Sequence, residues 1–376
     1  MKIAIEARAI SAKGGGVRTY AYQLIRHLLK VVPAQDVTVI IDQATARGTF
    51  PAARELLVPL RHETFLPLWL RWQIPRVLRQ FKPDVVHFTK ADVAGGSAKL
   101  RHYKTVVTIF DIIPVLFPAG QTLLRRLYWP RALERAALTS HHIVTISEAS
   151  RRDIITRYGV PEDKVTVTPL AVETNHFRPV PRDARWQKPY LLFVGTLEPR
   201  KNVPLLVRAF ARVAKNMPHQ LVIAGKSDSD YGNILREAEV QKLAGRVKIV
   251  DFIDYKDLPA LYSGADLFVW PSVYEGWGFP PQEAMACGTP VVVSDGGALP
   301  EVVGNAGEVV AFSADSLPGR MRDTDFEEHL ANKILSVLND QGKREEMSRA
   351  GLERVKQFSW DEVARKTLGV YKQLVG

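Results

Sequence analysis

Short apolar runs rich in β-branched residues alternate along the chain with longer segments whose apolar positions recur every three or four residues. The short runs predict strands at KIAIEA, VTVII, VVHFT, TVVTIF, HIVTIS and KVTVTP, and later at YLLFVG, QLVIAG, VKIVDF, LFVWP and TPVVVSD. Segments such as TYAYQLIRHLLK, SRRDIITRYG and NVPLLVRAFARVAK predict helices between them. Continuously apolar strands separated by helices are typical of parallel sheets built from βαβ units. The pattern therefore predicts an α/β protein.

The chain of 376 residues is longer than one hydrophobic core usually supports, so we expect two domains. The proline-rich segment RPVPRDARWQKP, residues 178–189, has no periodicity and is the best candidate for the link between them. We therefore expect residues 1–178 and 179–359 to form two Rossmann-like domains. Open sheets of this kind bind ligands at the carboxyl ends of their strands, here in a cleft between the domains.

The formal net charge of +11 comes from the first half of the chain. Residues 1–178 contain 26 Lys and Arg against 14 Asp and Glu, and the remaining residues contain 25 against 26. The asymmetry indicates either an anionic partner of the first domain or a solvated basic surface. A nucleic acid, an anionic membrane and a phosphorylated small molecule all remain open. The segment FLPLWLRWQIPRVLRQFK, residues 65–82, fits either a helix on an anionic membrane or, the favoured interpretation, an internal helix with a basic outer face.

Cysteine usage and hydropathy exclude other classes of protein. Cys287 is the only cysteine, so a disulfide framework is excluded and a reducing compartment is favoured. No apolar run reaches the roughly 18 residues that a membrane span requires. The first residues, MKIAIEARAI, predict a strand rather than a signal segment. We therefore expect a cytoplasmic protein.

The stretch SVYEGWGFPPQEAMACGTPVVVSD, residues 272–295, holds two carboxylates at a strand end and a helix start. Glu275 is expected in the loop after the strand LFVWP, and Glu283 in the first turn of a helix that begins at two prolines. The glycines Gly276 and Gly278 would let the backbone approach a ligand closely. The loop and the helix start would offer amides to phosphate, and the carboxylates could accept from a sugar diol. The alternative, a helix cap, accounts for Glu283 but not for Glu275 or the glycines.

Two further loops follow predicted strands. In GTLEPRKN, Gly195 and Thr196 lie at a strand end, and Arg200 and Lys201 offer a planar fork and a point charge suited to diphosphate. The alternative for this Arg-Lys pair is solvated surface. In SAKGGGVRTY, residues 11–20, the glycine run opens a helix but fails the spacing of the dinucleotide and P-loop motifs. It either makes room for a ligand or is a plain flexible turn.

Together these segments resemble family 4 of the retaining glycosyltransferases, whose GT-B fold consists of two facing Rossmann-like domains. The resemblance is most specific from Gly195 to Gly304, where Glu275 and Glu283 fit the E-x7-E motif of the family. GGGVRTY fits its N-terminal glycine loop. FDIIPV, TISEASRRDI and FSWDEVARKTLGVYKQL fit the branch that builds bacterial surface polysaccharides. The resemblance also implies that residues 360–376 return to the first domain.

The resemblance implies a donor that is a nucleotide-diphosphate sugar, with GDP-mannose or a UDP-sugar favoured, and an acceptor hydroxyl on a glycan or lipid-linked precursor. Glu283 would hold the ribose and Glu275 the transferred sugar, and no metal or other cofactor would be needed because two cations hold the diphosphate. The donor-binding residues would be Gly15, Gly16, Gly195, Thr196, Arg200, Lys201, Gly276, Trp277, Gly278, Phe279 and Glu283. The catalytic residues would be Glu275, Arg200, Lys201 and Asp111.

The first domain departs from the family pattern at two places. Phe110 stands where the family often has histidine, which makes Asp111 the better candidate for a polar contact to sugar or acceptor. Leu170 and Ala171 stand where the family usually has Asn-Gly. Neither change touches the donor motifs.

Three alternatives stay open beside this interpretation. A catalytically silent sugar-nucleotide-binding protein would keep the same motifs. A nucleic-acid-binding protein would fit the basic charge, but the scattered Lys and Arg do not interleave with aromatics on one element. A dinucleotide-dependent oxidoreductase lacks its glycine fingerprint. The D-x-D pattern in SDSD, residues 227–230, fits solvated turn aspartates better than a metal site.

Overall fold

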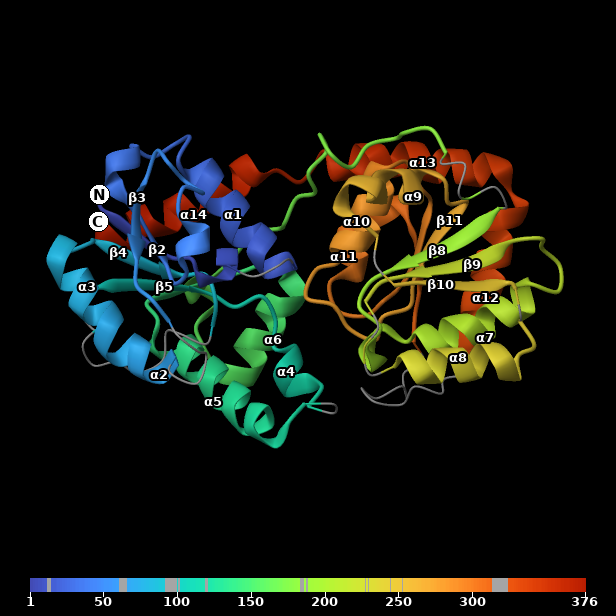
Figure 1. Ribbon diagram of the computed structural model, residues 1–376, viewed down its shortest axis with the longest axis horizontal. Coiled ribbons are helices and arrows are strands. Elements are labelled where there is room, and N and C mark those ends of the chain that lie inside the picture. Colours follow the sequence, from blue (N-terminus) through green and yellow to red (C-terminus); the bar gives the residue numbers. More distant parts are fainter. Residues whose placement is uncertain are drawn as a thin grey trace. The chain divides into compact units, whose positions relative to one another are not determined.

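The computed structural model describes residues 1–11, 15–60, 66–91, 100, 102–118, 121–182, 186, 189–226, 228, 230–243, 245–251, 253–312 and 324–376. The chain forms two compact units (Figure 1). The first consists of Met1–Leu170 with Ser359–Gly376, and the second of Ala171–Phe358.

The first unit is built on a parallel seven-stranded sheet with the order β3-β2-β1-β4-β5-β6-β7. Its strands are β1 (Ile3–Glu6), β2 (Val37–Ile41), β3 (Arg54–Leu57), β4 (Val85–Phe88), β5 (Lys104–Thr108), β6 (His142–Thr145) and β7 (Val165–Val167). Its α-helices are α1 (Gly16–Leu28), α2 (Leu66–Leu68), α3 (Ile74–Phe81), α4 (Ile113–Leu116), α5 (Leu123–Thr139), α6 (Glu148–Tyr158) and α14 (Trp360–Val375).

The second unit is built on a parallel six-stranded sheet with the order β10-β9-β8-β11-β12-β13. Its strands are β8 (Tyr190–Val194), β9 (Gln220–Ala224), β10 (Val247–Val250), β11 (Leu267–Trp270), β12 (Val291–Ser294) and β13 (Glu308–Val310). Its α-helices are α7 (Val203–Val213), α8 (Tyr231–Val240), α9 (Leu258–Ser263), α10 (Phe279–Ala286), α11 (Leu299–Val303), α12 (Thr324–Asn339) and α13 (Gln341–Val355). The predicted α/β class with parallel sheets is confirmed.

The sequence pattern misses two strands, β3 and β13, each at one edge of its sheet. The side chains of β3 are exposed or half-buried, and those of β13 are half-buried except for Val310. A strand that pairs on one side and is partly solvated needs no continuous apolar run. Its signal is therefore weak in the sequence.

The chain divides after Leu170, earlier than the link expected at 178–189. Part of that link packs on the second unit instead. The Val180 amide donates to Ser263 Oγ at 3.1 Å, and the rings of Trp186 and Tyr190 lie 5.7 Å apart. Prolines interrupt a helical or strand pattern without preventing a segment from packing, which explains the difference.

The last helix, α14, packs against α1 and reaches β4 and β5 of the first unit. The Tyr371 hydroxyl lies 2.5 Å from Nδ1 of His87, and Nε2 of His87 lies 2.8 Å from Oγ1 of Thr108. Burial lowers the pKa of His87 to about 3, so its neutral ring donates on one nitrogen and accepts on the other. This buried network ties the end of the chain to the first sheet.

Residues 66–82 form an internal segment, as the favoured interpretation predicts. A π-helical turn, Trp69–Gln73, joins α2 to α3. Trp69, Ile74 and Leu78 lie in the hydrophobic core, whereas Trp72 is 57% exposed. The arginines of the segment are exposed on its outer side.

Candidate functional site

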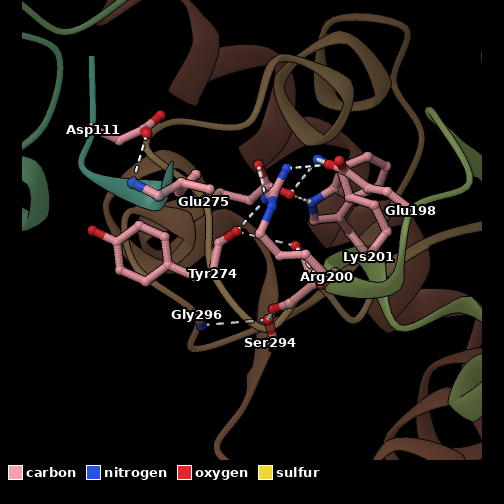
Figure 2. Close-up of polar contacts among 11 residues, drawn as sticks. Asp111, Glu198, Arg200, Lys201, Tyr274, Glu275, Ser294 and Gly296 are labelled. Carbon is pink, nitrogen blue, oxygen red and sulfur yellow. Dashed lines mark hydrogen bonds and ion pairs between the residues drawn. The ribbon is translucent and has the colours of Figure 1, made fainter. Parts of the chain in front are cut away.

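Two loops meet at the carboxyl ends of the neighbouring strands β8 and β11 (Figure 2). One contains the 3-10 turn Pro199–Lys201, and the other runs from Pro271 to Gly278. The carbonyl of Arg200 accepts from the Val273 amide at 2.8 Å and from Ser272 Oγ at 3.2 Å. The side chains that these loops carry are therefore held in a fixed relation.

The Glu275 carboxylate is the centre of this site. Its Oε1 accepts from Lys201 Nζ at 2.5 Å and from Trp270 Nε1 at 3.2 Å. Its Oε2 lies 2.9 Å from Nη1 of Arg200. Burial by itself would raise the pKa of Glu275, but Lys201 and Arg200 outweigh it and lower the pKa to about 2. Glu275 is thus a buried, ionised carboxylate clamped by two cations.

A second carboxylate, Glu198, shares these cations, and the sequence interpretation assigns it no role. Arg200 Nη2 donates to Glu198 Oε1, and Lys201 Nζ lies 4.0 Å from the same oxygen. Arg200 also donates to the carbonyl of Tyr274. Two cations therefore face two carboxylates, and the cluster is close to neutral. The position of Glu198 beside PRK in GTLEPRKN is the signal that could have identified it.

Lys201 is buried over the indole of Trp270, with its Nζ 4.7 Å from the ring centroid. Burial lowers the pKa of Lys201, and Glu275 opposes that shift. Trp270 in turn stacks on Phe193 at 4.7 Å. The aromatic wall keeps water from the ion pair, which strengthens it.

Gly195 has a packing role that the sequence interpretation does not foresee. A Cβ at this position would lie 2.7 Å from Cη2 of Trp270. Gly225, after β9, is packed even more closely, because a Cβ there would lie 1.9 Å from the carbonyl oxygen of Gly195. Gly195 makes room for the tryptophan that supports Glu275. Thr196, the next residue, is exposed.

The backbone of Glu275 is fixed by a turn after β12. Its amide donates to the Gly296 carbonyl at 3.3 Å, and its carbonyl accepts from the Ala298 amide at 2.9 Å. Gly297 has φ 64°, and a Cβ there would lie 2.3 Å from the Glu275 carbonyl oxygen. Only glycine fits this left-handed position. Gly296 and Gly297 therefore let this turn pack against the loop that carries Glu275 and hold that loop in place.

The residues after Glu275 differ in what they can offer a ligand. Trp277 is buried, with its ring edge-on to Phe358 at 5.2 Å, so only its backbone can serve a ligand. Gly278, with φ 132°, precedes α10, which begins at Phe279. Pro280 and Pro281 remove two amides from the first turn. Anion binding here would depend on the amides of residues 276–279 rather than on a complete helix terminus.

Glu283 does not lie in the first turn of α10, and that part of the prediction is wrong. The first turn holds no acidic residue, because the helix begins at Phe279. The Tyr262 hydroxyl donates to Glu283 Oε2 at 2.7 Å. Burial raises the pKa of Glu283 to about 7, Glu173 adds to the shift, and the Tyr262 hydrogen bond opposes it. A carboxyl in the second turn is not a helix cap.

The other predicted site residues, Asp111, Gly15 and Gly16, belong to the first unit. Asp111 Oδ1 accepts from the Ile113 amide at 2.9 Å, at the start of α4. Phe110 lies edge-on to Tyr20 at 5.0 Å. Gly15 has φ 95°, and a Cβ there would meet nothing within 4 Å, so the described part of this loop leaves open space. Gly14 lies outside the described residues.

In the described part of the chain, no group of three or more His, Cys, Asp or Glu could hold a metal ion. The expectation of solvated aspartates in SDSD is wrong for Asp230, which is buried and precedes α8. Its amide donates to the Leu197 carbonyl at 3.1 Å, and its Oδ1 accepts from Asn233. Ser227 and Ser229 lie outside the described residues. None of the helices that the structure describes is both long and apolar enough to cross a bilayer.

Comparison with known proteins gives consistent matches along the chain. A family model described as Glycosyl transferases group 1 matches residues 180–354, and one described as Glycosyltransferase Family 4 matches residues 14–176. The chain is 29% identical to O-antigen chain mannosyltransferase B of Escherichia coli, over 100% of both chains. It is 33% identical to the MMP alpha-(1->4)-mannosyltransferase of Mycolicibacterium hassiacum, over 67% of this chain and 59% of that one.

Two solved structures share the fold. Sucrose-phosphate synthase from Thermosynechococcus elongatus superposes with a TM-score of 0.75 at 22% identity, covering 99% of this chain and 98% of that chain. Anabaena Alr3699/HepE in complex with UDP and glucose gives a TM-score of 0.75 at 18% identity, covering 99% and 100%.

Replacing Gly195 by alanine tests its packing role. The added methyl would collide with Trp270, which is buried and stacked, so we expect the free energy of unfolding to fall by about 1–3 kcal/mol. Urea denaturation followed by circular dichroism measures the change. Gly232→Ala on α8 is the matched control, since a Cβ there meets nothing within 4 Å and helix propensity rises. A Gly195→Ala variant as stable as the parent would contradict this role.

Proposed function

Because the chain belongs to family 4 of the glycosyltransferases and has the GT-B fold, we propose that it moves a hexose from a nucleotide-diphosphate sugar to an acceptor hydroxyl, with retention of the anomeric configuration. The observation that carries the proposal is the buried cluster of Arg200, Lys201 and Glu275 at the strand ends of the second unit. The cluster holds positive groups and a carboxylate, which could stabilise the negative and the positive charge that such a reaction develops.

Cleavage of the donor separates charge along one bond. The bond between the anomeric carbon and the diphosphate oxygen breaks, and its electron pair leaves with the diphosphate. Arg200 and Lys201 would stabilise that negative charge, while the ionised Glu275 would stabilise the positive charge on the sugar ring. The acceptor oxygen then bonds to the anomeric carbon, and its proton passes to the leaving diphosphate. Asp111 would position the acceptor or the sugar, and Glu283 would hold the ribose.

The donor and acceptor are proposed from the relatives. Two relatives named as mannosyltransferases favour GDP-mannose, and the HepE complex with UDP and glucose keeps a UDP-sugar as the second candidate. The name of the Escherichia coli relative favours a glycan or lipid-linked acceptor of surface-polysaccharide synthesis. Such an acceptor would place the enzyme in the cytoplasm, with peripheral contact at the inner face of the membrane. A catalytically silent sugar-nucleotide-binding protein is the alternative.

Glu275→Gln tests the catalytic role directly. The amide keeps the shape but loses the charge that matters most in the transition state, so turnover should fall by about a hundredfold or more. Steady-state transfer with GDP-mannose or UDP-glucose measures turnover, and a separate donor titration measures donor binding.

Glu198→Gln is the matched control, because Glu198 contacts the same two cations but its side chain is 37% exposed. It should keep near-normal turnover. Equal losses in the two variants would contradict a special role for Glu275. A parent protein that binds the donor without transferring sugar would favour the silent alternative.

The raised pKa of Glu283 predicts a pH dependence of donor binding. With a pKa of about 7, the carboxyl is partly protonated at neutral pH. Ribose hydroxyls that donate to it favour its charged form, so donor affinity should rise with pH and level off above the pKa. Isothermal titration of the donor across neutral pH measures this.

Glu283→Gln should bind the donor roughly tenfold more weakly or worse at high pH, and without the pH dependence. Glu173→Gln should shift the profile to lower pH, because it removes a neighbouring negative charge. An unchanged profile in Glu283→Gln would rule out the ribose contact.

We expect activity to survive EDTA, because Arg200 and Lys201 supply positive charge where a metal would otherwise be needed. The measurement is initial transfer rate before and after chelation, followed by addition of magnesium or manganese. Complete loss that magnesium restores would show that a metal takes part.

A further inference from the structure

The first two turns of α5 project from the first unit. Their large apolar side chains are exposed, with Leu123 72%, Leu124 80% and Leu127 51% accessible to solvent. Leu123 and Leu124 are the most exposed large apolar residues that the structure describes. The helix is well formed even so, because Thr122 caps it by accepting from the Arg125 amide. Figure 1 shows α5 on the outside of this unit, and its later turns pack into the core through Leu133, Ala136 and Ala137.

These apolar side chains form one face. At about 100° per residue, Leu123, Leu127 and Leu138 fall within one stripe of the helix, and Leu124 and Tyr128 lie beside it. Leu138 and Tyr128 are exposed as well. The apolar part of this face is concentrated in the first two turns, because charged residues share its later turns. An exposed apolar patch is costly in water and usually marks a contact surface.

Arginines flank this face and also lie within its later turns. Arg125, Arg126, Arg131 and Arg135 are exposed on α5, against one exposed acidic residue, Glu134. Their long stems can lie along the apolar stripe while the guanidinium groups extend beyond it. Leucines bordered by several arginines match a lipid interface, where acyl chains lie beneath anionic phosphates. A protein partner would have to offer an apolar groove for the leucines with acidic groups on both sides of it for the arginines, which is a more specific requirement than an anionic lipid surface meets.

We propose that the N-terminal half of α5 docks the enzyme on an anionic lipid surface, with Leu123, Leu124 and Leu127 inserted at the interface and the arginines on headgroup phosphates. The sequence pattern directs attention to residues 65–82 instead, but most of their apolar side chains fill the core, and of the described apolar residues there only Leu68 and Trp72 are exposed. The idea that this lipid surface carries the acceptor rests on the proposed function. The docking of α5 on lipid does not depend on that function.

Vesicle sedimentation of the full chain, without donor or acceptor, tests the docking separately from the enzyme activity. The protein should bind vesicles of equal parts phosphatidylglycerol and phosphatidylcholine, bind pure phosphatidylcholine far less, and lose binding as salt increases. No binding to the anionic vesicles would overturn the proposal. Binding without sugar transfer would leave the docking intact and count only against the proposed function.

Paired variants identify the surface. Leu123→Gln with Leu124→Gln should weaken binding about tenfold or more, because two side chains no longer enter the interface. Arg125→Gln with Arg126→Gln should reduce binding only to anionic vesicles. Leu235→Gln with Val240→Gln, exposed apolar residues on α8, is the matched control and should bind as the parent does.

Two results would overturn the assignment of α5. One is an equal loss of binding in the α8 control. The other is gel filtration in which the parent is an oligomer and the leucine variant a monomer, because the stripe would then be an interface between copies of the chain. The leucine variant should transfer sugar to a water-soluble acceptor at the parent rate, which shows that the fold is intact.

Discussion

The ion pair between Lys201 and Glu275 is the interaction on which the rest of the second unit's site depends. Removing two charges from water is expensive, and the pair is stable only if its geometry is good and its remaining hydrogen-bond positions are filled. The pairing of β8 with β11 brings the two loops together, and Trp270 supplies both a hydrogen bond and a wall. Arg200 completes the neutralisation.

The near neutrality of this cluster changes how an anion would enter it. The two cations already have carboxylate partners, so a diphosphate must exchange with one of them. Glu198 is half-exposed and lies 4.0 Å from Lys201, whereas Glu275 is buried and lies 2.5 Å from it. Displacing Glu198 therefore costs less, since water can solvate the released carboxylate. In the proposed complex, Glu275 would then stay ionised beside the diphosphate.

Several residues of the glycosyltransferase motifs have a packing role. Gly195 clears space for Trp270, and Gly297 lets the turn after β12 press on the backbone of Glu275. Trp277 anchors its loop against Phe358. These residues hold the loops that carry the charged groups, and electrostatic stabilisation requires such fixed positions.

The sequence by itself determined the α/β class, most of the strands and the two loops whose charged side chains meet in the second unit. Those signals are local: a strand buried on both faces must be apolar throughout, and a loop at a strand end is marked by its glycines. The tertiary structure alone decided the edge strands β3 and β13, the sharing of two cations by Glu198 and Glu275, and the raised pKa of Glu283. It also decided that α5 exposes the leucines of its first two turns, whereas most apolar side chains of residues 66–82 pack in the core. Each of these depends on which distant residues surround a side chain, because burial and pairing are properties of the packed chain and not of any short segment.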